Sequence, residues 1–238
     1  MSNEVFTCTE ESSFYSHCLQ MLFDEYCDKA SVVHEFGSGD GVPMINALLA
    51  TSFKGMIHGY EISDASWNLA KTQIERSLTE ERYQVHLSDF FEVCPKSCSC
   101  ILVSNPPYLP AWPDTGLYMK ELYGGIDGTM ISRKLLSLKY RTVLLLVSSF
   151  SNPVDLLQYA AELGYEIANF LIKPLPFGHY SSQPEVKARI MELYRERTAF
   201  FSEHYYLLAG VIFQKKECAN MELFTNLIEI MQSLQQNL

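Results

Sequence analysis

The chain has 238 residues, of which 47% are hydrophobic, so its length and composition suit one medium-sized domain with a substantial core. Its 18 basic and 28 acidic residues give a net charge of −10, which opposes broad contact with nucleic-acid phosphates because such affinity comes mainly from Lys and Arg. No apolar run approaches the roughly 20 residues that span a bilayer, the first residues lack a signal-peptide pattern, and the seven cysteines show no disulfide spacing, so we expect a soluble cytoplasmic protein without membrane contact.

Short apolar runs alternate with amphipathic stretches, a rhythm typical of a parallel sheet covered by helices. In chain order we expect a helix at 10–27, a strand at 31–36, a helix at 42–52, a strand at 56–61, a helix at 64–77, strands at 83–89, 98–105 and 141–150, a helix at 152–164, strands at 166–172 and 205–213, and a helix at 221–236. No internal repeat divides the chain, so these elements predict a single α/β domain over 1–238.

Two long segments interrupt this rhythm: a Pro-, Gly- and Tyr-rich loop over 105–128, and an insertion over 174–203 that contains a helix-like stretch. Loops of this length inside a compact domain are usually functional or disordered. Both follow strands expected to run parallel, so both emerge at the carboxyl edge of the sheet, where ligands bind in open α/β folds. We expect the first to be an active-site loop and the second a substrate-side insertion, although a mere surface excursion also fits the insertion.

A glycine turn follows the first strand in the stretch HEFGSGDG, with Gly37, Gly39 and Gly41 alternating after Glu35 and with Ser38 inside the turn. Glycine lets a backbone turn sharply and approach a ligand closely. The spacing is not the G-x-G-x-x-G of a dinucleotide site, and the acidic residue disfavours a pyrophosphate. It suits a ligand with a cationic centre and an ammonium group, while the positive end of the next helix can face a carboxylate. S-adenosylmethionine carries these charges.

Acidic residues also end the next two strands. Glu61, beside Ile62, is placed to accept hydrogen bonds from both ribose hydroxyls. Asp89 is placed to accept from the adenine amino group, and Phe90 to cover a ring face. Each acid alone is usually a solvated loop residue, but three in the order that the cofactor requires predict an S-adenosylmethionine site.

This pattern resembles the class I S-adenosylmethionine-dependent methyltransferases over residues 31–214. The resemblance implies a Rossmann-like, seven-stranded, mostly parallel sheet with an antiparallel last strand and helices on both faces.

The stretch SNPPYLP, residues 104–110, follows the fourth strand, and alone it is compatible with a strand terminator and a turn. In this superfamily, Asn-Pro-Pro-Tyr resembles the signature of enzymes that methylate a nitrogen conjugated to a planar group. Such a nitrogen is a poor nucleophile, and acceptors at its two N–H groups, the Asn105 side-chain oxygen and the Pro106 carbonyl, favour its electron-rich form. Tyr108 is placed to stack on the planar group. Asn105, Pro106 and Tyr108 are therefore the predicted catalytic residues, and Asn105 also borders the cofactor.

A closer resemblance is to the HemK-like protein glutamine methyltransferases, in which the Asn-Pro-Pro-Tyr motif is followed by Gly-Gly-x-Asp-Gly, as in YGGIDG at 123–128 here. Their segment Pro-x-x-Asp/Glu-Thr, near the cofactor carboxylate, is matched partly by Glu11 and Ser12, with Cys8 in place of the proline, so Ser12 and Phe6 are candidate cofactor contacts. The resemblance implies a protein or peptide substrate. About 30 residues precede the first expected strand, so we expect the helical substrate domain of the bacterial release-factor enzymes to be absent. Shorter relatives also lack it, and some work with a small activator protein, so the resemblance also implies a possible activator partner.

Other interpretations stay open. The same motif serves enzymes that methylate an adenine amine in RNA or DNA, and the insertion could close over a small molecule. The fold could also serve as a non-catalytic partner in a heteromeric enzyme. The terminal helix is either core or a homodimer face. We assign no metal site, although two sets of potential ligands are present: Cys94, Cys98 and Cys100, and the histidines His34, His58 and His86, each three residues before a strand-end landmark.

Overall fold

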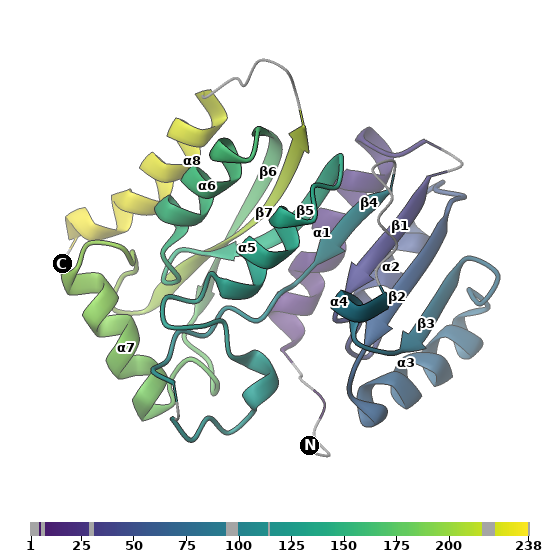
Figure 1. Cartoon of the computed structure of the whole chain (residues 1–238), viewed down its shortest axis with the longest axis horizontal. Helices are drawn as coiled ribbons and strands as arrows, with labels where there is room; N and C mark the ends of the chain where they lie inside the picture. Colours follow the sequence, from purple (N-terminus) through teal and green to yellow (C-terminus); the bar gives the residue numbers. More distant parts are fainter. Residues whose placement is uncertain are drawn as a thin grey trace. The chain divides into compact units, whose positions relative to one another are not determined.

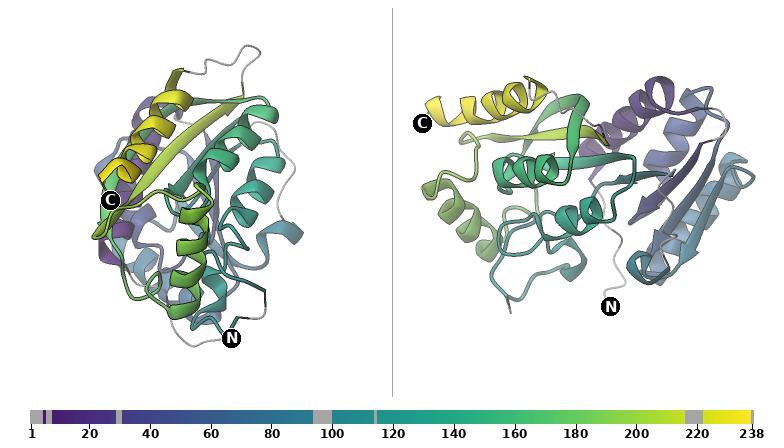
Figure 2. Two further views of the ribbon diagram at one scale, coloured as in Figure 1. Left: turned by 90° about the vertical axis from the view of Figure 1, so that its left-hand side faces the viewer. Right: turned by 45° about the horizontal axis from the view of Figure 1, so that its top comes forward.

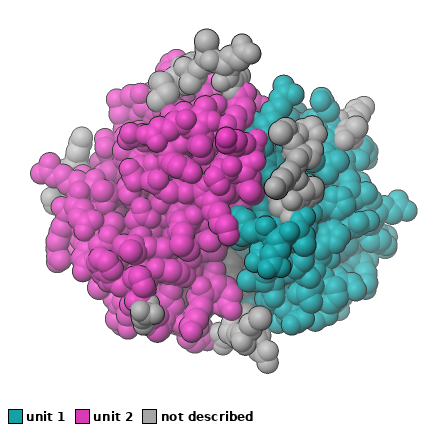
Figure 3. Space-filling model, in the orientation of Figure 1, with its two compact units in different colours: residues 1–105, 140–144 teal, residues 106–139, 145–238 magenta. Residues whose placement is uncertain are grey.

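The computed structural model describes residues 5, 8–28, 31–93, 100–113, 115–215 and 222–237. The chain forms two compact units, unit 1 with residues 1–105 and 140–144 and unit 2 with residues 106–139 and 145–238 (Figure 3). This division does not decide the prediction of a single domain, because strand β5 (Thr142–Ser148) contributes residues to both units. Within the described residues, no helix combines the length and the apolar character needed to traverse a bilayer.

Seven strands form one mixed sheet in the order β3-β2-β1-β4-β5-β7-β6 (Figure 1). The remaining strands are β1 (Val32–Phe36), β2 (Met56–Glu61), β3 (Tyr83–Leu87), β4 (Ile101–Ser104), β6 (Tyr165–Pro176) and β7 (Tyr205–Lys215). Strands β1 to β4 pair in parallel, and β6 and β7 pair antiparallel. The predicted Rossmann-like α/β fold is therefore confirmed, including its antiparallel last strand and helices on both faces.

In the described part of unit 1, four helices alternate with strands β1 to β3 along the chain. They are α1 (Thr9–Glu25), α2 (Val42–Ala50), α3 (Asp64–Ser77) and the short α4 (Phe90–Val93). Helix α1 packs on α2, and α2 packs on α3. Because side chains alternate along a strand, Glu35 of β1 points to the face covered by α1, while His34 lies on the opposite face in register with His58.

Unit 2 is built around the long β6–β7 pair. Its helices are α5 (Met130–Ser137), α6 (Pro153–Glu162), α7 (Pro184–Arg195) and α8 (Glu222–Gln232), with 3₁₀ turns η1 (Lys120–Leu122) and η2 (Ser233–Asn237). Helices α5 and α6 pack together, and α8 lies on the other side of β7 from α5 (Figure 2). The apolar residues of β5 and β7 are almost all buried, as expected for central strands.

Several element boundaries differ from the predictions. Helix α1 ends at Glu25 rather than at residue 27, because Tyr26 leaves the helical conformation while its N–H still donates to the Leu22 carbonyl. Strand β6 extends through Pro174 and Pro176, because it is the sheet's outermost strand and an edge tolerates missing N–H donors. Helices α4 and α5 were not predicted, and the predicted strand residues 98–99 and helix residue 221 lie outside the described part of the chain.

Candidate active site

The glycine turn after β1 is a left-handed backbone with open space on one side. Gly37, Gly39 and Gly41 have φ values of 70°, 57° and 75°, a region where only glycine is unstrained. A Cβ atom at Gly37 or Gly39 would meet nothing within 4 Å, whereas one at Gly41 would lie 3.4 Å from the Ala70 Cβ atom. The first two glycines therefore leave the backbone accessible to a ligand, and the third packs on α3.

The turn is hydrogen-bonded to the end of β2. The N–H groups of Gly37 and Ser38 both donate to the Tyr60 carbonyl, at 3.0 and 3.3 Å. Ser38 is buried, and its hydroxyl lies so close to Gly59 that a Cβ there would come within 2.2 Å of it. Gly59 is thus needed to let the turn fold down onto β2.

Glu61 lies beside the glycine turn at the carboxyl end of β2. One carboxylate oxygen accepts from the Gly39 N–H at 2.9 Å, and the other accepts from the Ile62 and Ser63 N–H groups at 2.8 and 2.9 Å. Three backbone donors thus hold the carboxylate in a fixed orientation. The Ile62 side chain is exposed next to it. The structure thus brings Glu61, Ile62 and the turn together, while the ribose contact stays a prediction.

Glu35, predicted to face the cationic part of the cofactor, is buried between two tyrosines. Its side chain is 2% exposed, and its two oxygens accept from the hydroxyls of Tyr15, at 3.4 Å, and Tyr83, at 2.5 Å. Burial raises the pKa of Glu35 to about 8, and the hydrogen bonds, led by that from Tyr83, offset only part of this effect. The carboxyl is therefore mainly neutral at pH 7 and is a poor partner for an ammonium group.

The start of α2 offers less to a ligand carboxylate than the sequence suggests. The Asp40 side chain accepts from the Val42 N–H at 3.0 Å, so the first amide of the helix is already capped. Burial raises the pKa of Asp40.

Asp89 and Phe90 follow β3 but play different structural parts. Asp89 is exposed and accepts from the Phe91 N–H at 2.8 Å, which leaves its adenine contact a prediction. Phe90 is 2% exposed and packs edge-on against Phe36 and Tyr60, with ring centroids 5.6 and 5.2 Å away. Its ring is therefore part of the core, and the predicted cover of a ligand ring does not fit this burial.

Asn105 is held by Glu11, an acidic residue in the first turn of α1. Its side-chain Nδ2 donates to Glu11 Oε1 at 2.7 Å, and Glu11 is itself buried. The Asn105 Oδ1 atom is buried and has no hydrogen-bond partner among the described residues. Because a carboxylate accepts and does not donate, Glu11 fixes which end of the amide faces away from it. Ser12 is next to Glu11 in the first turn of α1 and is half-buried, and Phe6 lies outside the described residues.

The rest of the predicted catalytic motif lies in unit 2. Pro106 is buried, and Tyr108 is 8% exposed with its ring against Phe150 at 5.7 Å between centroids. The Ser151 hydroxyl donates to the Tyr108 carbonyl at 2.7 Å. Packing on Phe150 orients the tyrosine ring, and its stacking on a substrate stays a prediction.

The glycines of YGGIDG explain why this motif accompanies Asn-Pro-Pro-Tyr. A Cβ at Gly124 would lie 2.7 Å from the Tyr108 Cα atom, and one at Gly128 would lie 2.5 Å from the Tyr108 carbonyl oxygen. Only glycine permits such close approach, and Gly128 also has a φ of 82°. The second motif is thus a support for the backbone of the first.

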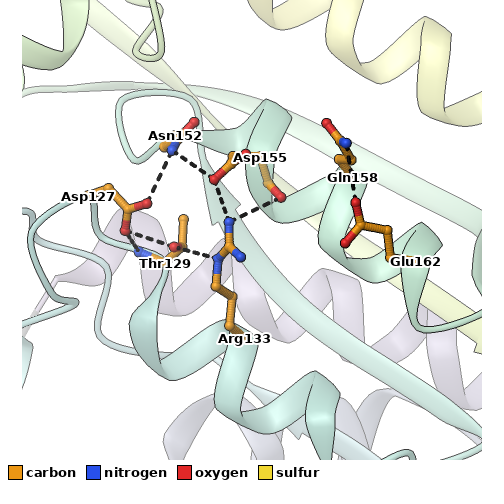
Figure 4. Close-up of polar contacts among 7 residues, drawn as sticks. All are labelled: Asp127, Thr129, Arg133, Asn152, Asp155, Gln158 and Glu162. Atoms are coloured by element: carbon orange, nitrogen blue, oxygen red, sulfur yellow. Dashed lines mark hydrogen bonds and ion pairs between the residues drawn. The ribbon is translucent and has the colours of Figure 1, made fainter.

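Asp127 anchors this support to α6 (Figure 4). Its carboxylate accepts from the Thr129 N–H and hydroxyl, at 2.9 and 2.7 Å, and from Asn152 Nδ2 at 3.1 Å. Arg133 extends the network, donating to the Thr129 hydroxyl at 3.1 Å and pairing with Asp155 at 2.5 Å. Polar contacts therefore tie the end of this loop to the start of α5 and to the start of α6.

The three histidines lie side by side across β1, β2 and β3. His58 Nδ1 is 3.2 Å from His86 Nε2, and His34 Nδ1 is 2.8 Å from the Tyr140 hydroxyl. Burial lowers the pKa of His34 to about 4, so it is neutral at pH 7. Among the described residues, no group of three or more His, Cys, Asp or Glu side chains could hold a metal ion. Cys94 and Cys98 lie outside the described residues, and Cys100 is buried.

Comparison with known proteins gives structural matches only. No protein-family model and no curated protein matches the chain. A Pyrococcus horikoshii protein, PH1948, thought to be an RNA methyltransferase, matches with a TM-score of 0.55 and 14% identity, over 86% of this chain and 82% of that one. A Geobacter sulfurreducens S-adenosylmethionine-dependent methyltransferase bound to S-adenosylhomocysteine matches with a TM-score of 0.50 and 14% identity, over 88% and 92%. The (4+2)-cyclase SpnF matches with a TM-score of 0.52 and 11% identity, over 84% and 80%.

At these identities the likeness establishes the fold. The presence of a cyclase among the matches means that the fold alone does not define the reaction. The resemblance to the HemK-like enzymes rests on the sequence motifs and stays a prediction. The chain has the fold of the class I S-adenosylmethionine-dependent methyltransferases.

Proposed function

We propose that the protein is an S-adenosylmethionine-dependent N-methyltransferase whose acceptor is the side-chain amide of a glutamine in a protein. The observation that carries this proposal is the buried Asn105 Oδ1 atom, which has no hydrogen-bond partner in the described part of the chain. Leaving such an acceptor unpaired costs roughly 1–3 kcal/mol, so a group that persists in this state is suited to receive a donor from a ligand.

Asn105 is a directed acceptor. With Nδ2 held by Glu11 at 2.7 Å, the amide is locked with its oxygen available to an N–H donor. A primary amide has two N–H groups on a nitrogen whose lone pair is delocalised. Accepting these hydrogens at a buried, pre-oriented oxygen stabilises the charge-rich, pyramidal form of the nitrogen in the transition state.

Pro106 follows Asn105 directly, so its carbonyl is the next acceptor along the chain. Proline has no N–H and a fixed φ, and it restricts the preceding residue as well, which holds both acceptors in place. Tyr108, with its ring packed on Phe150, is the residue that would lie against the planar amide. These three residues position and polarise the acceptor amide. After the methyl group has moved from the sulfur to the nitrogen, the surplus proton of the methylated nitrogen leaves to solvent.

Unit 1 fits the methyl donor at several points. Gly37 and Gly39 leave their backbone open, Glu61 and the exposed Ile62 lie beside them, and Asp89 is exposed after β3. In this proposal Glu61 takes the ribose hydroxyls and Asp89 the adenine amine, with Ser12 and Ser38 near the methionine part. S-adenosylmethionine supplies a methyl group on a cationic sulfur, ready for in-line attack by a nitrogen.

Two measurements test the proposal. Isothermal titration calorimetry of the whole protein should show one-to-one binding of S-adenosylmethionine and of S-adenosylhomocysteine, and a protein that binds neither would refute it. Incubation with methyl-labelled S-adenosylmethionine and fractionated cell extract should place the label in protein, on glutamine. Label in RNA or DNA would instead assign the acceptor as a nucleobase amine, and label in small molecules would refute both.

Asn105→Ala separates the acceptor from the donor site. We expect it to abolish transfer while leaving the affinity for S-adenosylmethionine within about twofold, since only the transition-state contact is removed. Asn68→Ala, an exposed asparagine on α3, is the matched control and should retain full activity. Equal loss of binding and transfer in Asn105→Ala would place Asn105 in the donor site instead.

A further inference from the structure

Unit 2 has a hollow of its own on the loop that follows Tyr108. It has a volume of about 210 Å³ and is lined by Trp112, Thr115, Leu117, Lys120 and Tyr123. Its lining combines the apolar surfaces of Trp112, Leu117 and the Tyr123 ring with two hydroxyls, those of Thr115 and Tyr123, and with the Lys120 ammonium group. A volume of this size accommodates one large side chain and is well below that of a drug-sized ligand site.

The segment around the hollow exposes large apolar side chains. Trp112 is 48% and Tyr118 53% exposed, and Ile126 and Met130 are also exposed. Four such residues within 19 positions stand out in unit 2, because exposed apolar groups gathered in one region mark interaction sites. Aromatic anchors of this kind dominate the energetics of protein interfaces.

The insertion holds this segment in place through Arg189 of α7. The Arg189 guanidinium lies 4.7 Å from the centre of the Trp112 ring, and its Nε donates to the Ile126 carbonyl at 2.9 Å. The Trp112 indole N–H donates to Glu192 at 3.1 Å. The Tyr118 N–H donates to the Gln183 side chain at 2.9 Å. The hollow is thus pre-formed, which lowers the entropic cost of binding.

Charge decides what the hollow can accept. Arg189 is paired with two carboxylates, Glu192 at 3.0 Å and Glu196 at 3.2 Å, so this cluster carries a net negative charge and offers no free cation to a ligand. That leaves Lys120 as the cation that lines the hollow in the described part of the loop. A nucleic-acid strand needs several basic contacts to its phosphates. One lysine beside an apolar hollow instead matches one carboxylate beside an apolar side chain.

We propose that this hollow is a docking site for a peptide segment of the protein substrate, taking one Leu- or Phe-sized side chain with an Asp or Glu next to Lys120. The proposal deepens the proposed function and rests on it, because it assigns the part of the substrate that flanks the target glutamine. It also gives the insertion a role, which is to hold the docking loop rather than to contact the acceptor itself.

Trp112 provides a direct readout, because the chain has only two tryptophans and Trp67 lies in unit 1. In a Trp67→Phe background, we would titrate peptide pools that share a central glutamine. The first pool carries Leu or Phe beside Glu, the second carries Lys in place of Glu, and the third carries Ser in place of Leu or Phe. The first pool should shift Trp112 emission with at least about fivefold higher affinity than the other two. Calorimetry on the unsubstituted protein repeats the measurement should Trp67→Phe fold poorly.

A charge exchange then tests the pairing. Lys120→Glu should weaken binding of the first pool by about fivefold and improve binding of the second. Lys54→Glu, an equal charge change at an exposed site in unit 1, is the control and should alter neither. Equal affinity for all pools, or no change in Lys120→Glu, would overturn the docking site. A shift of Trp112 emission with poly(A) or poly(U) but not with peptides would overturn the peptide site and indicate a nucleic-acid ligand instead.

The two proposals fail separately. Peptide binding without S-adenosylmethionine binding would remove the proposed function and retain the hollow as a peptide site. S-adenosylmethionine binding and methylation of protein without preference among the pools would retain the function and remove the docking site.

Discussion

Replacing the buried carboxyl of β1, Glu35→Gln, should change how the protein's stability depends on pH. Glu35 is 2% exposed, and burial raises its pKa from the ordinary value of 4.5 to about 8. A carboxyl with a raised folded-state pKa binds a proton that the unfolded chain releases. Its contribution is therefore fully present below pH 4.5 and is lost as the pH rises through 8.

The size of the effect follows from the two pKa values. Keeping the proton at pH 5 costs about 1 kcal/mol relative to an unfolded carboxyl, and at pH 7 about 3 kcal/mol. Glutamine keeps the shape and a carbonyl acceptor for Tyr83, and it does not titrate. The free energy of unfolding of the natural protein should therefore fall by about 2 kcal/mol relative to Glu35→Gln between pH 5 and pH 7.

Urea unfolding at pH 5, 6 and 7, followed by circular dichroism, measures this difference. Glu75→Gln on α3, an exposed glutamate, is the control and should run parallel to the natural protein across the range. Parallel curves for Glu35→Gln as well would show that Glu35 is ionised in the folded protein. The neutral-carboxyl account would then fail, and the sequence-based assignment of a charged Glu35 would regain support.

Two further substitutions test the acceptor region. Glu11→Gln removes the carboxylate that orients Asn105, and we expect kcat to fall by about 10- to 100-fold with S-adenosylmethionine affinity retained, measured by initial rates and calorimetry. An unchanged kcat would show that Glu11 does not act through Asn105. Gly128→Ala should destabilise by about 2–4 kcal/mol in urea unfolding, because the new Cβ meets the Tyr108 carbonyl at 2.5 Å. Gly164→Ala, at a φ of 80° with nothing within 4 Å, should show only the backbone strain, and equal losses in the two variants would refute the steric cause.

The fold was predictable because its signals are local. The run Thr142–Ser148 is buried at every position, so its continuous apolar sequence indicated a central strand directly. The alternating glycines after β1 indicated a sharp turn, and in the structure all three adopt positive φ. Helices α4 and α5 escaped prediction because one is a single turn and the other has eight residues, too short for a clear 3.6-residue period.

The direction of side chains at the site was harder to predict. Position at the carboxyl end of a strand is visible in the sequence, but the partner that a side chain faces is set by residues far away. Glu35 is paired with Tyr83, 48 residues on, and Phe90 is turned inward by Phe36 and Tyr60. Glu11 was visible only as a motif match, and its contact with Asn105 spans 94 residues.

The two motifs of the active-site loop owe their spacing to a steric requirement. A carbonyl that is to serve as an acceptor has to be kept out of a strand ladder, yet its backbone must be held firmly. In unit 2 the backbone of Tyr108 is held by the Ser151 hydroxyl and by two glycines whose missing side chains let the chain pass within van der Waals contact. Asp127, which belongs to the segment of the two glycines, then holds this segment at the start of α6 by accepting a hydrogen bond from Asn152. A Gly-Gly-x-Asp-Gly segment after Asn-Pro-Pro-Tyr is therefore a physical support for the acceptor loop, and a substitution in either motif should alter the backbone conformation of the other.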